Sequence, residues 1–425
     1  MNWKKAKISQ LIEEFERGIS YTSEEILDPT GIPMMNLACI DKTGFYRDGE
    51  MKFYSGKYAE EDLVYPNEML IACTDLTRNA DIIGTPIMVP CDNDFYLFTM
   101  DLAKLTTKPC IDKMFLYYAL KTSTYRKYIK KWATGTTVLH LNLRGVYDYE
   151  LWYPEDLEDQ KKLSILLSAL DKKIALNRQI NQNLEALARQ LYDYWFVQFD
   201  FPDANGKPYK SSGGKMVYNP ILKREIPEGW EVKKMEEVIE IKSGFPFQST
   251  TYLSKGQYSI ITIKNVQDGF LDLSGTDFID ELPERIPDYC ILKSGDILIS
   301  LTGNIGRVGR VFSDNLLLNQ RVGYVDCKNQ YNNWAYLYIT SSQVRLQIEK
   351  LGIGSAQLNV SPIQIGKIKL ALPTAQILSS FDKKLAPILE QILANSNEIL
   401  SLTKQRDELL PLLMNGQVNF DLSDD

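Results

Sequence analysis

The chain of 425 residues contains a single histidine, His140, which removes most of the acid–base and metal chemistry that histidines supply. A metal site built from several histidines is impossible, and histidine-based proton transfer would have to use His140 alone. Residues 138–143 alternate as in a strand, so we interpret His140 as a polar residue on a strand surface. We predict no catalytic residue and no metal site.

Other motifs that carry chemistry are missing too. No G-x-x-x-x-G-K-[ST] loop for ATP phosphates occurs. The string closest to the Asn/Asp-Pro-Pro-aromatic loop of amino-methyltransferases, residues 219–222, lacks the second proline and the aromatic residue. The glycine run 303–309 lies between strand-like segments, so we interpret it as a turn that leaves Arg307 and Arg310 free to point outward. The composition therefore favours a binding protein over an enzyme.

The six cysteines are far apart and form no C-x-x-C pair. This spacing is typical of buried thiols in a reducing cytoplasm rather than of disulfides or a zinc cluster. No run approaches 18 apolar residues, and the first residues lack the apolar core of a signal peptide. We expect a cytoplasmic protein that does not enter a membrane.

The segments that would position a binding surface occur twice. Residues 31–45 match residues 256–270, because in each stretch two glycines are 13 residues apart and the second precedes phenylalanine. Residues 135–154 match residues 354–373 without a gap. A repeat of more than 200 residues is too long for a solenoid, so it indicates a duplicated domain.

Trp3 and Trp230 correspond near the start of the two copies, and each copy continues into a long helical pattern that contains Asp-Lys-Lys. The globular parts alternate short apolar runs with Gly, Pro, Asn and Asp, which is typical of β-rich domains with some helix. We predict an α+β fold: two mainly-β domains separated by two long helices, which form an intramolecular antiparallel coiled coil with a pseudo-two-fold internal repeat. The predicted segments are 1–155 (first domain), 156–205 (first helix and linker), 206–374 (second domain) and 375–425 (second helix).

Both predicted helices have coiled-coil spacing. In the first helix, position a holds Leu163, Leu170, Asn177, Leu184 and Leu191, and position d holds Leu166, Lys173, Ile180, Leu187 and Tyr194. In the second, position a holds Leu378, Leu385, Ile392, Ile399, Arg406 and Leu413, and position d holds Phe381, Ile388, Asn395, Leu402 and Leu409. Leu167, Ile174 and Trp195 widen the first apolar stripe, and we expect them to dock a partner.

Each stripe contains one asparagine near its middle. Antiparallel helices place position a against position d, so Asn177 would face Asn395. A buried amide without a partner costs stability, and mutual pairing of these two would therefore fix the register. Roughly 40 residues per helix give a rod of about 60 Å.

The formal net charge is −7, which by itself argues against nucleic acid, but the charges are unevenly distributed. Residues 104–144 contain nine Lys or Arg and only Asp112 as an acid, a local charge of +8, with tyrosines and a tryptophan interleaved. Residues 301–350 contain six Lys or Arg and three acids, a local charge of +3. Phosphate binding needs such a local cationic surface rather than a basic whole chain.

The chain resembles a known family, the DNA specificity subunits of type I restriction–modification systems. The resemblance rests on residues 295–306 (GDILISLTGNIG), 318–321 (LNQR), 227–230 (PEGW), 170–174 (LDKKI) and 406–411 (RDELLP), in this duplicated arrangement. The first copy departs from the pattern: it has Asn67-Glu68 in place of Gly295-Asp296, residues 76–79 (LTRN) in place of the glycine run, and no LNQR.

The resemblance implies that each globular copy is a target recognition domain that reads one half of a bipartite, asymmetric site in double-stranded DNA. It implies that the helix pair sets the spacer and docks two methyltransferase subunits, and that restriction–translocase subunits join for cleavage. Adenine methylation, S-adenosylmethionine, ATP and Mg²⁺ would belong to those partners, with no cofactor in this chain. The chain would be a non-catalytic subunit.

We predict individual DNA contacts from residue type. Candidates for the phosphate backbone are Arg78, Lys121, Arg126, Lys127, Lys130 and Lys131 in the first copy, and Lys264, Arg307, Arg310 and Arg345 in the second. Candidates for base edges, where Arg and amide side chains can bond guanine or adenine bidentately, are Arg47, Asn79, Asn265, Asn304, Gln320 and Arg321.

Three alternatives remain open from the sequence. The chain could be the specificity subunit of a type II-like methyltransferase–endonuclease. It could be a two-headed scaffold for protein or glycan ligands, whose affinity for DNA would lack the salt dependence of phosphate contacts. It could also be a DNA enzyme with an unrecognised site, which would act on labelled cofactor or DNA without partners.

Overall fold

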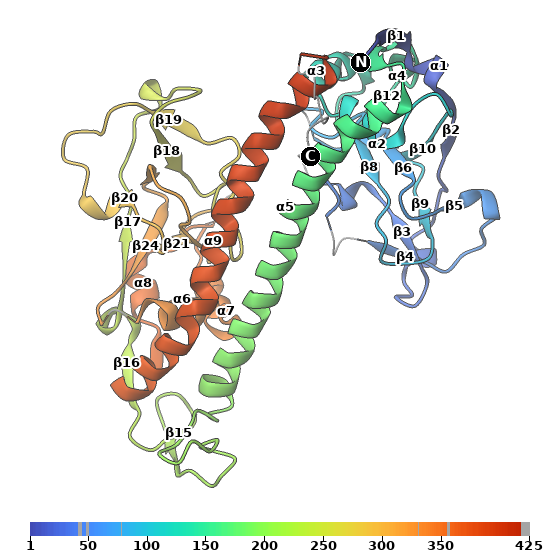
Figure 1. The fold of residues 1–425 in the computed structure, drawn as a ribbon. Coiled ribbons are helices and arrows are strands. Elements are labelled where there is room, and N and C mark those ends of the chain that lie inside the picture. Colours follow the sequence, from blue (N-terminus) through green and yellow to red (C-terminus); the bar gives the residue numbers. More distant parts are fainter. Residues whose placement is uncertain (41–44, 48–50, 78, 330, 355–357, 418–425) are drawn as a thin grey trace, which may run out of the picture. The chain divides into compact units, whose positions relative to one another are not determined.

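The computed structural model describes residues 1–40, 45–47, 51–77, 79–329, 331–354 and 358–417. The chain divides into two compact units (Figure 1). Unit 1 comprises Met1–Lys173 and Leu402–Asp425, and unit 2 comprises Ile174–Ser401. Each unit therefore contains one globular copy and part of both long helices. The four-segment division of the sequence stays a prediction.

Unit 1 is built on two four-stranded sheets. The first has the order β2 (Ile12–Arg17), β10 (Leu102–Thr107), β6 (Met69–Ala72) and β8 (Pro86–Met88), all antiparallel. The second has the order β4 (Lys52–Tyr54), β3 (Ile32–Met35), β9 (Tyr96–Phe98) and β5 (Leu63–Val64), with β3 parallel to β9. Smaller ladders join β1 (Trp3–Lys7) to β13 (Glu150–Pro154), and β7 (Thr74–Asp75) to β12 (Leu139–Leu141) and β11 (Ala133–Thr134).

Short helices cover the first sheet of unit 1. They are α1 (Ile8–Leu11), α2 (Lys113–Ala119), α3 (Ser123–Ile129) and α4 (Arg144–Asp148). The first turn of α2 is capped by the Asp112 carboxylate, which accepts the Phe115 N–H at 2.8 Å. Phe115, Tyr118 and Tyr125 from these helices are fully buried and belong to the same core as Leu163 and Leu167 of the first long helix. This packing fixes α2 and α3 against the start of that helix.

Unit 2 repeats the two four-stranded sheets of unit 1 in the same strand order. One sheet has the order β17 (Ile239–Ser243), β24 (Val322–Cys327), β21 (Ile297–Ser300) and β22 (Val308–Arg310), and the other has the order β19 (Asp277–Ile279), β18 (Tyr258–Ile261), β23 (Leu316–Leu318) and β20 (Ile291–Leu292). The pair β18–β23 is parallel, like β3–β9. The pair β16 (Glu231–Lys234) and β25 (Lys369–Leu372) matches β1–β13, and α6 (Asn332–Thr340), α7 (Ser342–Lys350) and α8 (Pro362–Gly366) match α2, α3 and α4. A hairpin of β14 (Met216–Asn219) and β15 (Arg224–Pro227) has no counterpart among the described residues of unit 1.

The register of one small ladder confirms the duplication at single-residue level. In unit 1, β12 pairs His140 with Thr74, and in unit 2 an isolated bridge pairs Asn359 with Thr302. Asn359 lies 219 residues after His140, which is the offset that aligns residues 135–154 with 354–373. The strand predicted at His140 is also confirmed, since its side chain is exposed on β12.

The two long helices are α5 (Leu157–Tyr192), which continues into a π-helical turn at Asp193–Val197, and α9 (Ala375–Met414). They pair antiparallel within each unit: Arg406 contacts Asp171 in unit 1, and Asn395 contacts Asn181 in unit 2. In α9 every predicted a position is buried or half-buried. In α5 the predicted d positions Ile180 and Leu187 are exposed, and this part of the heptad prediction is wrong. The buried stripe of α5 follows positions a and e instead, which keeps the seven-residue repeat but shifts its register.

The predicted pairing of Asn177 with Asn395 is wrong by one helical turn. Asn177 donates to Glu398 Oε2 at 2.7 Å, and Asn395 donates to Asn181 Oδ1 at 2.9 Å. Both predicted asparagines are nevertheless buried, and each bonds across the helix pair. The sequence prediction missed Asn181 because this residue lies at position e, whereas only positions a and d were assigned to the seam.

Candidate nucleic-acid interface

In unit 1 the loop 76–83, of which the structure describes all residues but 78, follows β7 and is held by Asp75. The Asp75 carboxylate is fully buried and accepts backbone N–H groups from Thr77 at 2.7 Å, Ile82 at 2.6 Å and Ile83 at 3.0 Å. A buried carboxylate that accepts several amide protons shapes a loop strongly, because losing any of them leaves a charged group unsatisfied. The loop is therefore pre-formed on a strand end.

Arg126 of α3 supports the same loop from a second side. Its guanidinium donates to the carbonyls of Ile83, Asp81 (2.9 Å) and Ala80 (3.5 Å). Burial lowers the pKa of Arg126 below its usual value. The prediction that Arg126 contacts phosphate is wrong, because its donors are used inside the fold to position the loop.

One exposed cation contacts this loop, and two more lie on the same helical segment. Lys130 is exposed and donates to the Asn79 carbonyl at 2.9 Å, while the Asn79 side chain itself is exposed. Lys127 and Lys131 are exposed on the same helical segment. The structure thus places Lys130 against Asn79, with two further predicted lysines exposed on the same helical segment. Arg78, also predicted, lies outside the described residues.

Two other predicted residues of unit 1 lie elsewhere. The Lys121 ammonium is buried, 3.6 Å from the ring centroid of Phe45 and 4.2 Å from that of Tyr117. Arg406 of α9 lies over the same Phe45 ring at 4.5 Å. Two cations against one aromatic ring are a packing arrangement, so the prediction that Lys121 contacts DNA is wrong. Arg47 is exposed and donates from Nε to the Ala38 carbonyl at 3.1 Å.

In unit 2 the loop 301–307 occupies the equivalent place. Thr302 Oγ1 donates to Asn359 Oδ1 at 2.6 Å, and the Gly303 N–H donates to the Leu358 carbonyl at 2.8 Å. Gly303 and Gly306 have φ of +75° and +80°, a conformation that favours glycine. The glycine run is therefore a tight turn, as predicted, and it leaves Asn304 exposed.

Three predicted cations of unit 2 meet at the neighbouring turn 264–270. Arg307 donates to Gln267 Oε1 at 2.7 Å, and Arg345 pairs with Asp268 at 2.8 Å and with Glu349 at 3.0 Å. Gln267 in turn donates to the Lys264 carbonyl at 2.7 Å, and Lys264 is exposed. Arg307 and Arg345 are half-buried, so they present part of each guanidinium at the surface.

Two predicted contacts of unit 2 belong to the interior instead. Asn265 is 3% exposed, accepts the Thr262 N–H at 2.9 Å and donates to the Asp272 carbonyl at 2.8 Å. The Arg310 guanidinium donates to the Gly295 carbonyl at 3.5 Å, and burial lowers its pKa. Both predictions of DNA contact are wrong, as is the expectation that Arg310 points outward.

Gln320 and Arg321 follow β23 and are exposed. The Arg321 carbonyl accepts the N–H of Leu301 at 3.2 Å, one residue before Thr302. Arg321 therefore lies beside the loop 301–307, and Asn304 and Arg321 share this region.

Sequence reasoning missed His140 and Asn359, which lie beside the two loops because they pair with Thr74 and Thr302. The offset of 219 could have identified them, because it aligns His140 in the first copy with Asn359 in the second, and both are polar.

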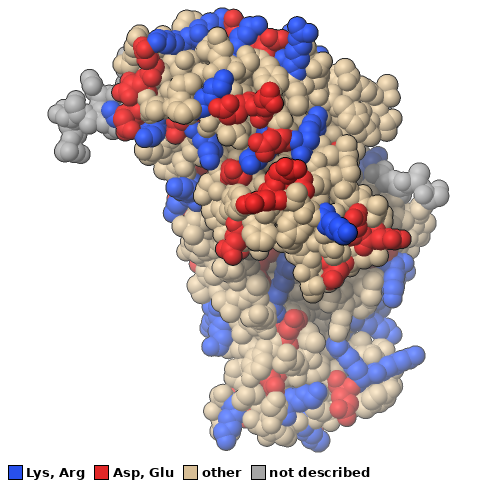
Figure 2. Space-filling model, turned by 90° about the vertical axis from the view of Figure 1, so that its right-hand side faces the viewer, with Lys and Arg blue, Asp and Glu red and all other residues tan. Residues whose placement is uncertain are grey.

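The strongly basic segment of the first copy is partly neutralised by the fold. Lys104 lies 3.4 Å from Glu16 and 3.6 Å from Glu68, and Lys113 donates to the Asn67 carbonyl at 2.8 Å. On the face shown in Figure 2, acidic and basic side chains are interspersed rather than gathered into one field. The cations that remain exposed near the loop 76–83 are thus a small, local set.

The three residues predicted to dock a partner are buried. Leu167 is 0%, Ile174 3% and Trp195 3% exposed, and the Trp195 ring lies 5.3 Å from that of Phe381. They widen the stripe toward the chain's own core, so this prediction is wrong. The exposed apolar side chains of α5 lie on another face: Leu176 is 55%, Ile180 36% and Leu187 49% exposed.

Comparison with known proteins decides the family. The profile described as Type I restriction modification DNA specificity domain matches residues 1–186 and 227–409. The chain belongs to this family. The predicted resemblance is confirmed, and the two matched stretches correspond to the two copies of the type I specificity fold.

Related chains agree with this assignment. The Type I restriction enzyme MjaIX specificity subunit of Methanocaldococcus jannaschii is 28% identical over 309 residues, which cover 72% of this chain and 68% of the relative. The Type I restriction enzyme HindI specificity subunit of Haemophilus influenzae is 24% identical over 381 residues, covering 77% and 83%. The crystal structure of the type I S subunit from M. genitalium matches with a TM-score of 0.57 at 18% identity, covering 97% and 96%, and shows the same fold.

Two kinds of feature are absent from the described residues. No described helix is both long and apolar enough to cross a membrane. Within the same part of the chain, no three or more His, Cys, Asp or Glu side chains gather in a way that could hold a metal ion.

Proposed function

We propose that this chain is the DNA-reading, non-catalytic subunit of a type I restriction–modification complex. Each globular copy would read one half of a bipartite, asymmetric site in double-stranded DNA, and the helix pair would set the gap between the halves. The observation that carries the proposal is the duplicated loop: 76–83 follows the bridge of Thr74 to His140, and 301–307 contains the matching bridge of Thr302 to Asn359. Both loops are held by side chains within their own unit, and both present an exposed asparagine.

The division of labour within each copy follows from the geometry. Arg126 and Asp75 hold the first loop, so exposed Asn79 has a fixed place from which to meet a base edge. The neighbouring Lys127, Lys130 and Lys131 supply phosphate contacts that orient the domain but carry no sequence information. In the second copy Asn304 and Arg321 would contact bases. Lys264, Arg307 and Arg345 would contact the phosphate backbone of the DNA.

The exposed apolar face of α5 is the surface that we assign to a methyltransferase subunit. Leu176, Ile180 and Leu187 follow one another at four and seven residues and therefore lie on one side of the helix. Three large exposed apolar side chains in a row on a helix are unusual unless a partner covers them. They replace the buried Leu167, Ile174 and Trp195 as docking residues.

The finer partners follow from the family. Two methyltransferase subunits would supply adenine methylation with S-adenosylmethionine, and restriction–translocase subunits would supply ATP- and Mg²⁺-dependent cleavage. The complex would work in the cytoplasm, where its DNA is. This chain would recognise the DNA sequence and provide the surface on which the other subunits assemble.

Loop variants test the reading function in cells that carry the chain with its methyltransferase. Asn79→Ala should relax one half of the methylated motif, and Asn304→Ala should relax the other half, while the gap stays the same. Gln182→Ala, an exposed change on α5, is the matched control and should leave the motif intact. If neither asparagine variant alters the motif, or if either alters both halves, the assignment of one loop to each half-site is wrong.

A paired deletion tests the spacing function. Residues 177–183 and 393–399 face each other in the antiparallel pair, and removing both takes out the pairs Asn177–Glu398 and Asn181–Asn395 while Leu176 and Leu187 stay in place. Each helix would shorten by about 10 Å. The gap in the methylated motif should shrink by roughly three base pairs at 3.4 Å per base pair, with both half-sites unchanged. An unchanged gap would contradict the proposal.

A further inference from the structure

A short two-stranded ribbon stands beside the loop 76–83 of unit 1. Its strands are β11 and β12, in which Thr134 pairs with His140. Gly135, in the turn between the strands, has a φ of +123°, and a β-carbon there would lie 2.1 Å from the Val138 carbonyl oxygen. Only glycine fits such a turn without strain. The ribbon therefore has a defined shape that its sequence specifies.

The ribbon and the loop 76–83 share a strand. β12 pairs with β7 as well as with β11, so that Thr74 faces His140 and Asp75 faces Leu139. Asp75 is the buried carboxylate that holds the loop through the N–H groups described above. Because one strand carries both attachments, the loop and the ribbon have fixed places relative to each other.

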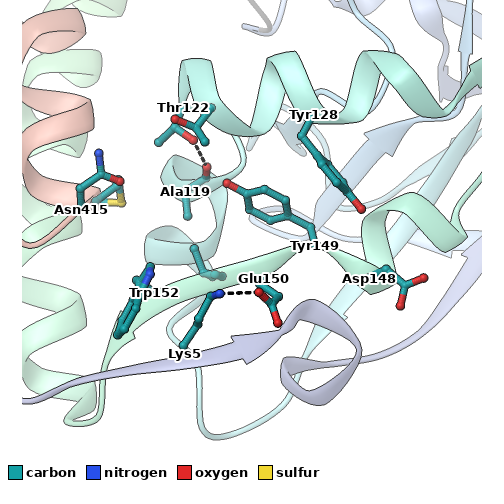
Figure 3. Close-up of a pocket in the computed structure, with 12 residues that line it drawn as sticks. Lys5, Ala119, Thr122, Tyr128, Asp148, Tyr149, Glu150, Trp152 and Asn415 are labelled. Atoms are coloured by element: carbon teal, nitrogen blue, oxygen red, sulfur yellow. Dashed lines mark hydrogen bonds and ion pairs between the residues drawn. The ribbon is translucent and has the colours of Figure 1, made fainter.

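Aromatic packing fixes the base of this ribbon. The ring of Tyr128, on α3, lies 6.2 Å from that of Trp132 and 5.0 Å from that of Tyr149, centroid to centroid. Figure 3 shows Tyr128 and Tyr149 side by side at an open cavity of about 440 Å³. Trp132 directly precedes β11, and its carbonyl accepts the Asn142 N–H at 3.0 Å just after β12. Both ends of the ribbon are thus tied to the helix that also supports the loop.

Unit 2 has a matching ribbon beside the loop 301–307. Its described residues are 352–354 and 358–360. Ile353 pairs with Asn359, and Asn359 pairs with Thr302 at the start of the loop. Gly354 has a φ of +137°, close to that of its counterpart in unit 1. At the offset of 219, the pair Ile353–Asn359 stands where unit 1 has the pair Thr134–His140.

The side chains of both pairs are accessible. Thr134, His140 and Asn359 are exposed, and Ile353 is 66% exposed. Within the part of the chain that the structure describes, no group hydrogen-bonds the His140 imidazole. Residues directly opposite each other in an antiparallel pair project to the same face. Each ribbon therefore presents a two-residue face, which is threonine with histidine in unit 1 and isoleucine with asparagine in unit 2.

The two ribbons share a framework but differ in the chemistry of this face. Glycine recurs at the turn, and Leu139 of the first ribbon matches Leu358 of the second. Thr134, by contrast, is replaced by Ile353. A single exposed isoleucine is common on protein surfaces, so its exposure alone carries little weight. Its position carries more, because it stands beside a reading loop, opposite an amide, where the other copy has a hydrogen-bonding residue.

The major groove of B-DNA admits a two-stranded ribbon, and it distinguishes bases by hydrogen-bonding groups and by the C5 methyl group of thymine. Apolar side chains contact that methyl group, whereas side chains with N–H groups can bond the N7 acceptor of a purine. The two faces suit these two kinds of base edge. Ile353 matches a methyl group, and His140 matches an acceptor.

From these observations we infer that the two ribbons are second reading elements that enter the major groove beside the loops. Ile353 contacts the methyl group of a thymine in one half-site, and His140 donates to a purine in the other. The inference rests on the proposed function and names the base chemistry that each copy requires. The two half-sites therefore differ in the kind of base edge that their ribbons read.

Deoxyuridine, which is thymidine without the C5 methyl group, tests the contact of Ile353. The methyltransferase complex would be bound to its cognate duplex with each thymine of both half-sites replaced in turn. One replacement should weaken binding about fourfold, as expected for one methyl group that loses an apolar contact. The Ile353→Ala complex should bind this duplex and the parent duplex equally, and Ile353→Val should keep the sensitivity. Ile221→Ala, at another exposed isoleucine of unit 2, should behave like the parent.

His140→Ala tests the other ribbon in cells that carry the chain with its methyltransferase. One base pair of the methylated motif should become degenerate, in the half that does not contain the thymine sensed by Ile353. The gap should stay the same, and Gln182→Ala should leave the motif intact.

Two results would overturn the inference. One is an Ile353→Ala complex that is as sensitive to every deoxyuridine as the parent. The other is an unchanged motif with His140→Ala. The loop variants Asn79→Ala and Asn304→Ala test the proposed function separately, so a failure of the ribbons can be told apart from a failure of DNA reading by this chain.

Discussion

Asn395 of α9 donates a hydrogen bond from Nδ2 to Oδ1 of Asn181 on α5, with 2.9 Å between the two atoms. Asn181 in turn donates to Ser396 Oγ at 3.2 Å and to the Ile392 carbonyl at 3.3 Å. One turn away, Asn177 donates to Glu398 at 2.7 Å. These polar layers interrupt an otherwise apolar seam. A slip of one turn would leave several buried amides without partners, so they favour one register.

The register claim predicts a coupled loss of stability. Asn395→Leu should lower the free energy of unfolding by about 1–3 kcal/mol, because the Asn181 carbonyl loses its buried donor. The double variant Asn181→Leu with Asn395→Leu should cost less than the sum of the two single changes. Urea denaturation followed by circular dichroism measures all three, with Gln182→Ala as an exposed reference. Additive losses would show that the two amides do not act as a pair.

The buried ion pair of unit 1 predicts a larger effect. Arg406 lies 3.0 Å from Asp171, their side chains are 10% and 15% exposed, and Tyr118 also donates to Asp171 at 2.9 Å. Arg406→Met should destabilise unit 1 by about 3–5 kcal/mol, since it strands a largely buried carboxylate. Adding Asp171→Asn should recover part of the loss. Denaturation midpoints measure this, and a midpoint for Arg406→Met equal to that of the parent would contradict the prediction.

The two helices could be predicted to different extents, because the apolar heptad residues of α9 are covered within the chain whereas some of those of α5 are exposed. The α9 heptad was correct because its a and d residues are all buried or half-buried, Phe381 and Leu385 fully. The α5 heptad failed at Ile180 and Leu187, which are apolar but exposed. A seam and a docking surface for another protein use the same residue types, so the sequence does not separate them.

The two kinds of basic residue on α3 predict different DNA phenotypes. Lys127→Met removes an exposed charge and should weaken binding to all DNA about equally, with the log–log salt slope smaller by about 0.9 if it contacts one phosphate. Arg126→Met removes the support of Ala80, Asp81 and Ile83. It should leave the salt slope unchanged and reduce discrimination between the cognate site and one altered in a single half. Salt-dependent binding of the assembled methyltransferase complex measures both, and equal phenotypes would refute the distinction.

The same arginine shows why the site was only partly predictable. An arginine that donates to backbone carbonyls and one that donates to phosphate cannot be told apart by residue type or by their neighbours in the sequence. The basic segment contains the exposed lysines on and just after α3, but the sequence does not reveal the inward direction of Arg126 or Arg310. That direction depends on which buried carbonyls need donors, which only the packed fold determines.

Thiol chemistry provides a test of the cores. Cys91 and Cys110 are exposed, while Cys39, Cys73, Cys290 and Cys327 are buried. Burial raises the pKa of Cys73 to about 12, so at pH 8 its reactive thiolate is almost absent. Ellman's reagent at pH 8 should therefore modify two thiols quickly in the native chain and all six after denaturation. Rapid reaction of Cys73, mapped by mass spectrometry, would contradict the core described for unit 1.

Docking on α5 predicts a loss of assembly without a loss of fold. Leu176→Glu with Leu187→Glu places charges on the exposed apolar face and should abolish co-purification with the methyltransferase subunit. The circular dichroism spectrum and denaturation midpoint should stay the same, because neither side chain is buried. Gln182→Glu provides a matched charge on another exposed position of the helix. Retained co-purification of the double variant would move the docking surface elsewhere.

The most direct test of the central claim is a comparison of methylomes. Methylated adenines would be mapped by single-molecule sequencing in a host that carries this gene with its methyltransferase, and again after deletion of this gene alone. We predict that a two-part motif with a fixed gap disappears with the gene. A motif that persists unchanged, or the absence of any two-part motif before deletion, would contradict the claim that this chain reads the DNA.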